Sequence, residues 1–84
     1  MPHVTIYTRP ACPYCTSAKE LLESKGVAYE EINASGDRRP EMVERAHGRN
    51  TFPQIFIGDV HVGGCDDIHA LDEKGELDSL LAGK

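Results

Sequence analysis

The alternation of apolar and polar positions predicts a strand, a helix and a second strand in the first part of the chain. Residues 3–8 alternate and are rich in β-branched and aromatic side chains, which is typical of a strand. Apolar positions three and four apart follow Pro13 and stop before Gly26, so a helix is predicted between these two residues. Residues 27–32 predict a second strand. Because a helix connects the two strands, we expect them to lie parallel.

The rest of the chain continues with a helix, a hairpin and two short helices. Ser35 or Asp37 is the expected N-cap of the first of these helices. Gly58 and Asp59 lie between two short apolar runs, which predicts a tight turn between antiparallel strands. The predicted elements are a helix over 38–47, strands over 54–57 and 60–62, and helices over about 66–73 and 77–82. The sequence therefore predicts an α/β fold in β-α-β-α-β-β-α order, followed by a final helical turn.

Length and composition limit what this fold can contain. The 84 residues, of which 39% are hydrophobic, are enough for a single domain over 1–84 with a packed core. No run of about 18 apolar residues is present, so no membrane span is predicted. The first residues lack the basic region followed by an apolar region that marks a signal peptide. We therefore expect a cytoplasmic protein with no membrane partner.

The net charge of −5 is distributed unevenly along the chain. Residues 1–50 carry seven Lys/Arg and seven Asp/Glu, whereas residues 51–84 carry two Lys/Arg and seven Asp/Glu. All of the negative excess therefore lies toward the C-terminus. A nucleic-acid partner is not expected, because such binding requires a basic patch or stripe.

Two cysteines three positions apart carry the clearest chemical signal. Cys12 and Cys15 lie between the first predicted strand and the following helix, where a Cys-x-x-Cys sequence is typical of a redox dithiol. Cys12 directly precedes the helix start at Pro13, where unpaired N–H groups and the positive end of the helix favour an anionic thiolate. Arg9 adds a nearby positive charge, while burial keeps the Cys15 thiol neutral one turn further into the helix. We therefore predict that Cys12 attacks a substrate disulfide and that Cys15 resolves the mixed disulfide.

A zinc site and a purely structural role are the alternatives for this cysteine pair. Zinc would need two more ligands, which Cys65 together with His61 or His69 could supply. The four histidines show no paired metal spacing, and we assign none of them a role. With three cysteines, the chain does not have the even number that is typical of a disulfide-stapled secreted domain. A catalytic dithiol in a reducing compartment is therefore favoured.

A glycine pair followed by acidic residues indicates a second feature of the site. Gly63 and Gly64 allow close backbone approach just before a predicted helix, whose N-terminus is suited to bind a carboxylate. Asp66 and Asp67 are expected to cap this helix, and an aspartate here can also accept a hydrogen bond from an ammonium group. This segment therefore suits a ligand that carries both an ammonium group and a carboxylate.

Three segments together resemble the active-site motifs of the glutaredoxins, a family of the thioredoxin-like superfamily. They are Cys12-Pro13-Tyr14-Cys15, Thr51-Phe52-Pro53 and Gly63-Gly64-Cys65-Asp66-Asp67. The resemblance covers essentially the whole chain and implies a thioredoxin-like fold, with a four-stranded mixed sheet flanked by helices. It also implies a cis peptide bond before Pro53, although Pro53 alone would equally fit the start of a strand. Phe52 replaces the usual valine of the family, and its larger ring is expected to reshape the substrate groove.

The resemblance implies a glutathione-dependent thiol–disulfide oxidoreductase. Glutathione would be the reducing co-substrate, and no metal is expected. Cys12 and Cys15 together would reduce protein disulfides, and Cys12 alone would remove glutathione from protein–glutathione mixed disulfides. Arg9 is the expected partner of the glycine carboxylate of glutathione, with Arg38 and Arg39 as weaker candidates. The residues implied in glutathione binding are Arg9, Tyr14, Thr51, Phe52, Pro53, Gly64, Cys65 and Asp66.

The same resemblance implies a monomer whose partners are glutathione and disulfide-containing or glutathionylated proteins. Ribonucleotide reductase is a familiar target of the family, and nothing in the sequence selects or excludes it. One alternative is an iron–sulfur carrier, a dimer that holds a cluster through two Cys12 thiolates and two glutathiones. Pro13 counts against it, because relatives with proline at this place generally hold clusters poorly. Another alternative is an oxidoreductase fed by thioredoxin reductase, but glutaredoxin-like proteins of that kind lack the motif at residues 63–67.

Overall fold

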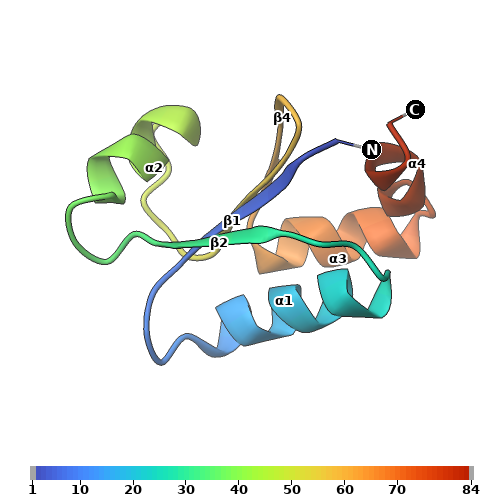
Figure 1. Ribbon diagram of the computed structural model, residues 1–84, viewed down its shortest axis with the longest axis horizontal. Helices are drawn as coiled ribbons and strands as arrows, with labels where there is room; N and C mark the ends of the chain where they lie inside the picture. The colour runs from blue at the N-terminus through green and yellow to red at the C-terminus, as the bar shows by residue number, and fades with distance from the viewer. Residues whose placement is uncertain (1, 84) are drawn as a thin grey trace.

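The computed structural model describes residues 2–83 and contains a four-stranded mixed sheet flanked by helices (Figure 1). Strand order in the sheet is β2-β1-β3-β4, with β1 and β2 parallel and the other neighbours antiparallel. In chain order the elements are β1 (Val4–Thr8), α1 (Pro13–Ser24), β2 (Glu30–Asn33), α2 (Arg39–Arg45), β3 (Gln54–Ile57), β4 (Val60–Gly63), α3 (Cys65–Glu73) and α4 (Leu77–Leu81). The predicted fold class and element order are confirmed. Within the described residues, no helix has the length and apolar character needed to cross a membrane.

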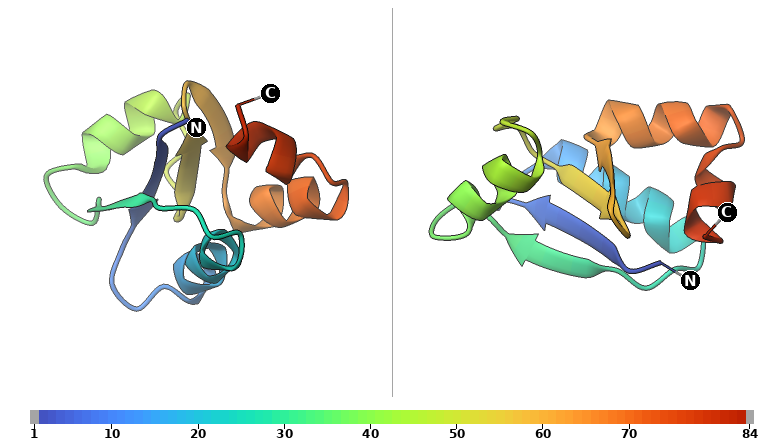
Figure 2. Two further views of the ribbon diagram at one scale, coloured as in Figure 1. Left: turned by 45° about the vertical axis from the view of Figure 1, so that its right-hand side comes forward. Right: turned by 90° about the horizontal axis from the view of Figure 1, so that it is seen from above.

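Two apolar clusters lie on opposite faces of the sheet, because successive side chains of a strand point to opposite sides. Ile6 of β1 belongs to the cluster beneath α1, α3 and α4, whereas its neighbour Tyr7 belongs to the cluster beneath α2. Figure 2 shows α2 alone on one face and the other three helices on the opposite face. Both Ile6 and Tyr7 are fully buried. Burying an apolar side chain of this size stabilises a fold by about 1.5–3 kcal/mol, so β1 is held from both sides.

The second strand is shorter than the sequence predicts. It begins at Glu30 rather than at residue 27. The parallel register places Thr5 opposite Glu30, so residues 27 and 28 would face Pro2 and His3, which precede β1. Val27 still packs into the cluster beneath α1, although its backbone joins no ladder. The apolar residues before Glu30 therefore reflect burial of side chains and not pairing of the backbone with β1.

The predicted cap of the second helix is wrong. α2 begins at Arg39, and the residue before it provides no side-chain cap. Ser35 instead donates its backbone N–H and its hydroxyl to Asn33 Oδ1, at 2.9 and 2.7 Å. A single helical-type bond from the Arg39 N–H to the Gly36 carbonyl, 3.0 Å long, connects the loop to α2. Ser35 therefore stabilises the preceding turn and lies too early to cap the helix.

A hydrogen-bonded group ties α2 to the sheet beneath it. The Tyr7 hydroxyl donates to Glu41 Oε2 at 2.6 Å and accepts from Arg45 Nη1 at 2.9 Å. Arg38 pairs with the other oxygen of Glu41 at 2.9 Å. The hydrogen bonds from Arg38 and then Tyr7 lower the pKa of Glu41 to about 2. The ionised form of Glu41 is therefore the form that the fold stabilises.

Replacing Glu41 with glutamine is expected to make stability less dependent on pH in the acid range. A carboxyl whose pKa is lowered by folding contributes stability above its ordinary value, here 4.5, and loses that contribution as pH falls through about 2. Urea unfolding of wild type and Glu41→Gln at neutral pH and near pH 2 measures this. At neutral pH the wild type should have a larger free energy of unfolding than Glu41→Gln. This difference should shrink toward pH 2. An equal difference at both pH values would contradict the assigned role.

Candidate redox site and adjoining groove

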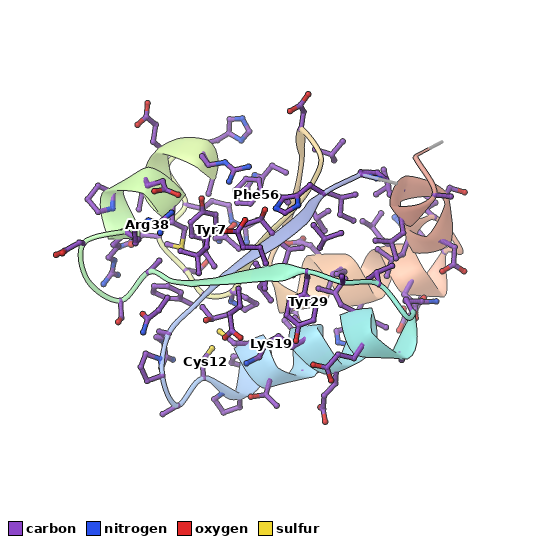
Figure 3. All side chains as sticks on the ribbon, in the orientation of Figure 1. Tyr7, Cys12, Lys19, Tyr29, Arg38 and Phe56 are labelled. Carbon is purple, nitrogen blue, oxygen red and sulfur yellow. The ribbon has the colours of Figure 1, made fainter. Side chains whose placement is uncertain are left out.

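Cys12 caps the N-terminus of α1 and lies at the carboxyl end of β1 (Figure 3). Proline at the next position is pre-set for a helix start, so the chain turns into α1 directly after this cysteine. Cys12 Sγ accepts a hydrogen bond from the Cys15 N–H at 3.2 Å. The predicted position of the attacking cysteine at a helix start is therefore confirmed, whereas its role remains a proposal.

Cys15 lies one turn further along α1 in a different environment. It is 2% exposed, compared with 5% for Cys12. Burial, and then the hydrogen bond with Cys12, raise the pKa of Cys15 to about 12, while a backbone hydrogen bond from Arg9 acts in the opposite direction. Both cysteines are free. The two thiols are therefore chemically unequal, with the Cys15 thiol protonated at neutral pH.

A groove of about 350 Å³ is lined by Tyr14, which lies between the two cysteines in the chain. Its walls come from the start of α1, the loop before β3 and the start of α3. Six of the eight residues predicted to bind glutathione line it: Tyr14, Thr51, Phe52, Gly64, Cys65 and Asp66. Tyr14 is 63% exposed and separates this groove from a second hollow between α1 and α3. The fold thus brings together residues that are up to 53 positions apart, since Tyr14 and Asp67 line the same groove.

The loop before β3 is held rigidly against the sheet. Gln54 is fully buried, and its Nε2 donates to the Thr51 carbonyl and hydroxyl at 3.0 and 2.9 Å. The predicted cis peptide bond between Phe52 and Pro53 is confirmed. Pro53 itself is buried behind the groove, and its carbonyl oxygen lies 3.3 Å from the place where a side chain at Gly64 would begin. Gly64 therefore allows the backbones of the two loops to approach each other.

The start of α3 presents both a cation and a helix terminus to the groove. Asp67 accepts a hydrogen bond from the Gly64 N–H at 2.8 Å, so this aspartate caps α3 as predicted. That bond is the main reason why the pKa of Asp67 is lowered, and Arg49 adds to it. Arg49 Nη1 lies 3.2 Å from Asp67 Oδ2 and lines the groove. Since the first N–H groups of a helix have no partner within it, the terminus and Arg49 together can receive an anion.

Sequence reasoning did not identify Arg49, and it expected other arginines here. The Arg9 guanidinium folds over the carbonyls of Pro10 and Ala11, at 3.2 and 3.3 Å, and borders a separate hollow. Arg39 bonds to the Asn50 side chain at 2.7 Å and does not line the groove. The structure therefore does not bring Arg9 or Arg39 to the groove. Arg49 lies in a loop without periodicity, and only the contact with Asp67 reveals where its side chain points.

The other predicted residues of interest are Cys65 and the histidines. Cys65 is buried at the first position of α3 and borders the groove. The histidines show no paired spacing in the sequence, but the fold brings two of them together, with His47 Nδ1 3.3 Å from His61 Nδ1. His69 approaches the Ser17 hydroxyl at 3.1 Å. Among residues 2–83, no three His, Cys, Asp or Glu side chains lie close enough together to hold one metal ion jointly.

Comparisons with known proteins agree over nearly the whole chain. The family model for glutaredoxin matches residues 4–62. Glutaredoxin 3 of Escherichia coli K12 is 54% identical over 83 residues, which cover 96% of this chain and 99% of that protein. A glutaredoxin of Pseudomonas aeruginosa is 54% identical over 84 residues, which cover 98% of this chain and 99% of that protein.

Solved structures give the same result. The solution structure of a glutaredoxin from Brucella melitensis has a TM-score of 0.85 and 63% identity, and covers 100% of this chain and 94% of that one. A structure from work on the metal binding of glutaredoxins has a TM-score of 0.74 and 63% identity. The match covers 96% of this chain and 89% of that one. The complex of a buckwheat glutaredoxin with glutathione has a TM-score of 0.86 and 25% identity. The match covers 98% of this chain and 78% of that one.

Proposed function

The chain belongs to the glutaredoxin family, and from this premise we propose that it is a glutathione-dependent thiol–disulfide oxidoreductase. Its redox role follows from the family. The dependence on glutathione is supported by one observation above all, the groove lined by Tyr14 of the Cys-x-x-Cys segment, which holds a cation, a helix N-terminus and an acidic residue. Glutathione carries two carboxylates and one ammonium group, and these three features complement them. The buckwheat relative of the same fold was solved with glutathione bound.

In the proposed monothiol reaction, Cys12 alone reacts with the substrate. Its thiolate attacks the glutathionyl sulfur of a protein–glutathione mixed disulfide, a new S–S bond forms, and the protein thiolate leaves and takes up a proton. The thiolate of a second glutathione then attacks the Cys12-bound glutathionyl sulfur. This releases oxidised glutathione and restores the Cys12 thiolate, so one free glutathione is consumed and the disulfide bond passes from the protein to glutathione.

In the proposed dithiol reaction, Cys15 replaces the second glutathione at the resolving step. Cys12 attacks a protein disulfide and forms a mixed disulfide with one of its sulfurs. Cys15 then loses its proton and attacks Cys12 Sγ, which releases the reduced protein and leaves a Cys12–Cys15 disulfide. Two glutathiones reduce that disulfide. Since burial raises the pKa of Cys15, this thiol stays protonated until the mixed disulfide changes its surroundings.

We assign the groove residues to glutathione as follows. The backbone of Thr51 and Phe52 pairs with the extended tripeptide, and the start of α3 with Cys65 receives a carboxylate. Asp66 accepts from the ammonium group, and Arg49 adds a positive charge beside the same end. Tyr14, Pro53 and Gly64 shape the walls. Arg9 reaches a carboxylate only if its guanidinium leaves the carbonyls of the preceding loop, so Arg49 is the stronger assignment.

Replacing Arg49 with glutamine is expected to raise the KM for a glutathionylated peptide roughly three- to tenfold with little change in kcat, because an exposed charge contributes to binding rather than to sulfur exchange. Lys74→Gln is the matched control, since it removes the same charge at the other end of α3. A steady-state assay coupled to glutathione reductase measures both constants. Equal KM values for Arg49→Gln and Lys74→Gln would remove Arg49 from the proposed site.

The proposal extends to compartment, assembly and partners. The three free cysteines fit the reducing conditions of the cytoplasm, where we expect the protein to act as a monomer. Its protein substrates are disulfide-containing or glutathionylated proteins, with ribonucleotide reductase among the disulfide enzymes to be tried. The decisive experiment compares turnover of a glutathionylated substrate with glutathione and glutathione reductase against turnover with thioredoxin reductase. Activity that depends only on thioredoxin reductase would refute the dependence on glutathione.

A glutathione-ligated iron–sulfur carrier is the second candidate. The 63% identical relative studied for metal binding of glutaredoxins favours its consideration. In such a carrier, Cys12 of two chains and two glutathiones would hold one cluster. Absorbance of protein purified without oxygen tests this, because a cluster produces charge-transfer bands in the visible range. A colourless protein with full glutathione-coupled activity would refute the carrier and support the oxidoreductase.

A further inference from the structure

Two histidines that the redox chemistry does not use meet beside α2. His47 lies in the turn after α2, and His61 lies on β4. Their Nδ1 atoms are 3.3 Å apart, and the ring planes are inclined at 45° with centroids 5.3 Å apart. The two rings thus approach through their nitrogen edges. Fourteen positions separate the two residues, which is why sequence spacing did not reveal the pair.

The orientation of His61 follows from the hydrogen bonds of Gln54. The Gln54 Nε2 group is committed to the carbonyl and hydroxyl of Thr51, so only its Oε1 faces the histidine. An amide oxygen accepts and never donates, so His61 Nε2, 2.7 Å away, must carry the proton. In the neutral ring the other nitrogen then has a free lone pair. Nδ1 of His61 therefore directs a lone pair toward His47.

The surroundings of His61 favour the neutral ring and restrict its orientation. Burial lowers the pKa of His61, the positive charges of His47 and Arg49 act in the same direction, and Asp67 of α3 opposes them. The ring stacks on Phe56 of β3, with centroids 4.9 Å apart and planes 23° apart. Metal-binding histidines commonly donate their second N–H to a fixed acceptor, which sets the tautomer and the ring direction. Gln54 is such an acceptor.

We propose that His47 and His61 form a binding site for a borderline divalent transition-metal ion such as Zn²⁺, held by the two Nδ1 atoms. Two nitrogens bonded to tetrahedral Zn²⁺ at about 2.0–2.1 Å lie about 3.3 Å from each other. The separation of the two Nδ1 atoms, 3.3 Å, already matches this distance, so the rings need only rotate to direct both lone pairs at one ion. Water completes the coordination. Imidazole ligands suit Zn²⁺, Ni²⁺ and Cu²⁺, whereas Mg²⁺ prefers oxygen ligands.

This site is independent of the cysteines and of glutathione. Its ligands lie near the Arg49 wall of the groove, since His47 precedes Arg49 by two positions and His61 precedes Gly63 by two. Thiolates bind the same metals, so a test must remove them from competition. A chain with Cys12→Ser, Cys15→Ser and Cys65→Ser does this. Oxidised Cys65→Ser, in which a disulfide occupies Cys12 and Cys15, provides a second sample if the triple variant does not fold.

Nitrogen-15 NMR of the histidine rings during a Zn²⁺ titration tests the proposal. Saturable shifts with one-to-one stoichiometry are expected at Nδ1 of both His47 and His61, with His3 and His69 unchanged and with no shift from Mg²⁺. His47→Gln and His61→Gln should each weaken Zn²⁺ binding at least about tenfold, because each removes one of two protein ligands. His3→Gln, which removes an exposed histidine that bonds to Glu30, should leave the affinity unchanged.

Two outcomes would overturn the proposal. One is a Zn²⁺ affinity that His47→Gln does not change. The other is a set of weak, equal shifts at all four histidines, which would indicate that the short Nδ1–Nδ1 approach is a shared proton only. Glutathione-coupled turnover plays no part in either measurement, so a failure here leaves the proposed oxidoreductase intact.

Discussion

Replacing Cys12 with serine is expected to lower both glutathione-coupled activities by at least about a thousandfold, because a serine hydroxyl does not ionise at neutral pH and cannot attack a disulfide. The fold should survive this change. Cys12 Sγ accepts the Cys15 N–H at the start of α1, and serine is a preferred residue at that position of a helix. Loss of activity with an unchanged NMR spectrum would therefore report on chemistry and not on folding. The rate is followed as NADPH consumption through glutathione reductase.

Cys15→Ser provides the matched control and is expected to separate the two activities. Removal of glutathione from a peptide should persist, since that reaction needs only Cys12, whereas reduction of a protein disulfide should fall to the background rate. The separation rests on the inequality of the two thiols, of which Cys15 is buried and kept protonated. Cys65→Ser should change neither activity, because only the backbone N–H of this residue is assigned to the carboxylate. An equal loss of both activities in a folded Cys15→Ser protein would show that the roles are assigned wrongly.

Replacing Gly63 with alanine is expected to destabilise the fold by roughly 2–4 kcal/mol, which corresponds to a fall in Tm on the order of 10–25 °C for a domain of this size. Two effects combine at this residue. Its φ of 113° is a conformation that alanine rarely adopts, and a Cβ here would collide with the Asp67 carboxylate. That carboxylate caps Gly64 and pairs with Arg49, so the collision also displaces the groove wall. The KM for a glutathionylated peptide should rise together with the loss of stability.

Gly75→Ala separates backbone strain from collision. Gly75 also has a positive φ, of 75°, but a Cβ there would meet no atom within 4 Å. This variant should therefore lose only the backbone contribution, about 1–2 kcal/mol, and should keep the wild-type KM. Thermal unfolding and steady-state kinetics on both variants make the comparison. Equal losses of stability in Gly63→Ala and Gly75→Ala would mean that Asp67 moves away from the new Cβ with no cost in free energy.

The sequence predicted those parts of the fold and site that depend on local pattern. Helix positions followed from apolar spacing, and the turn at Gly58 and Asp59 followed from its residue types. The position of Cys12 at a helix start needed only Pro13 beside it. These features are fixed by residues that are neighbours in the chain, so they can be identified without knowing the tertiary structure.

The features that sequence reasoning missed depend on partners far apart in the chain. β2 begins at Glu30 because β1 provides no ladder before Val4, which the residues of β2 do not encode. Arg49 points into the groove because Asp67 lies opposite, and His47 meets His61 only after β4 has folded beside α2. Long side chains in loops have many accessible rotamers, and tertiary contacts select among them. Residue type alone could not choose between Arg9, Arg39 and Arg49.

The placement of both cysteines within one helical turn has a consequence for reversibility. A bond between Cys12 and Cys15 would close a ring of only four residues. In the chain-entropy description, such a ring restricts the unfolded state by about 2 kcal/mol, whereas a loop of 100 residues gives about 4.7 kcal/mol. The folded chain therefore gains less than half as much resistance to unfolding when this ring closes as it would from a loop of 100 residues. Oxidation and reduction can alternate here at a smaller cost in stability than a long-range disulfide would impose.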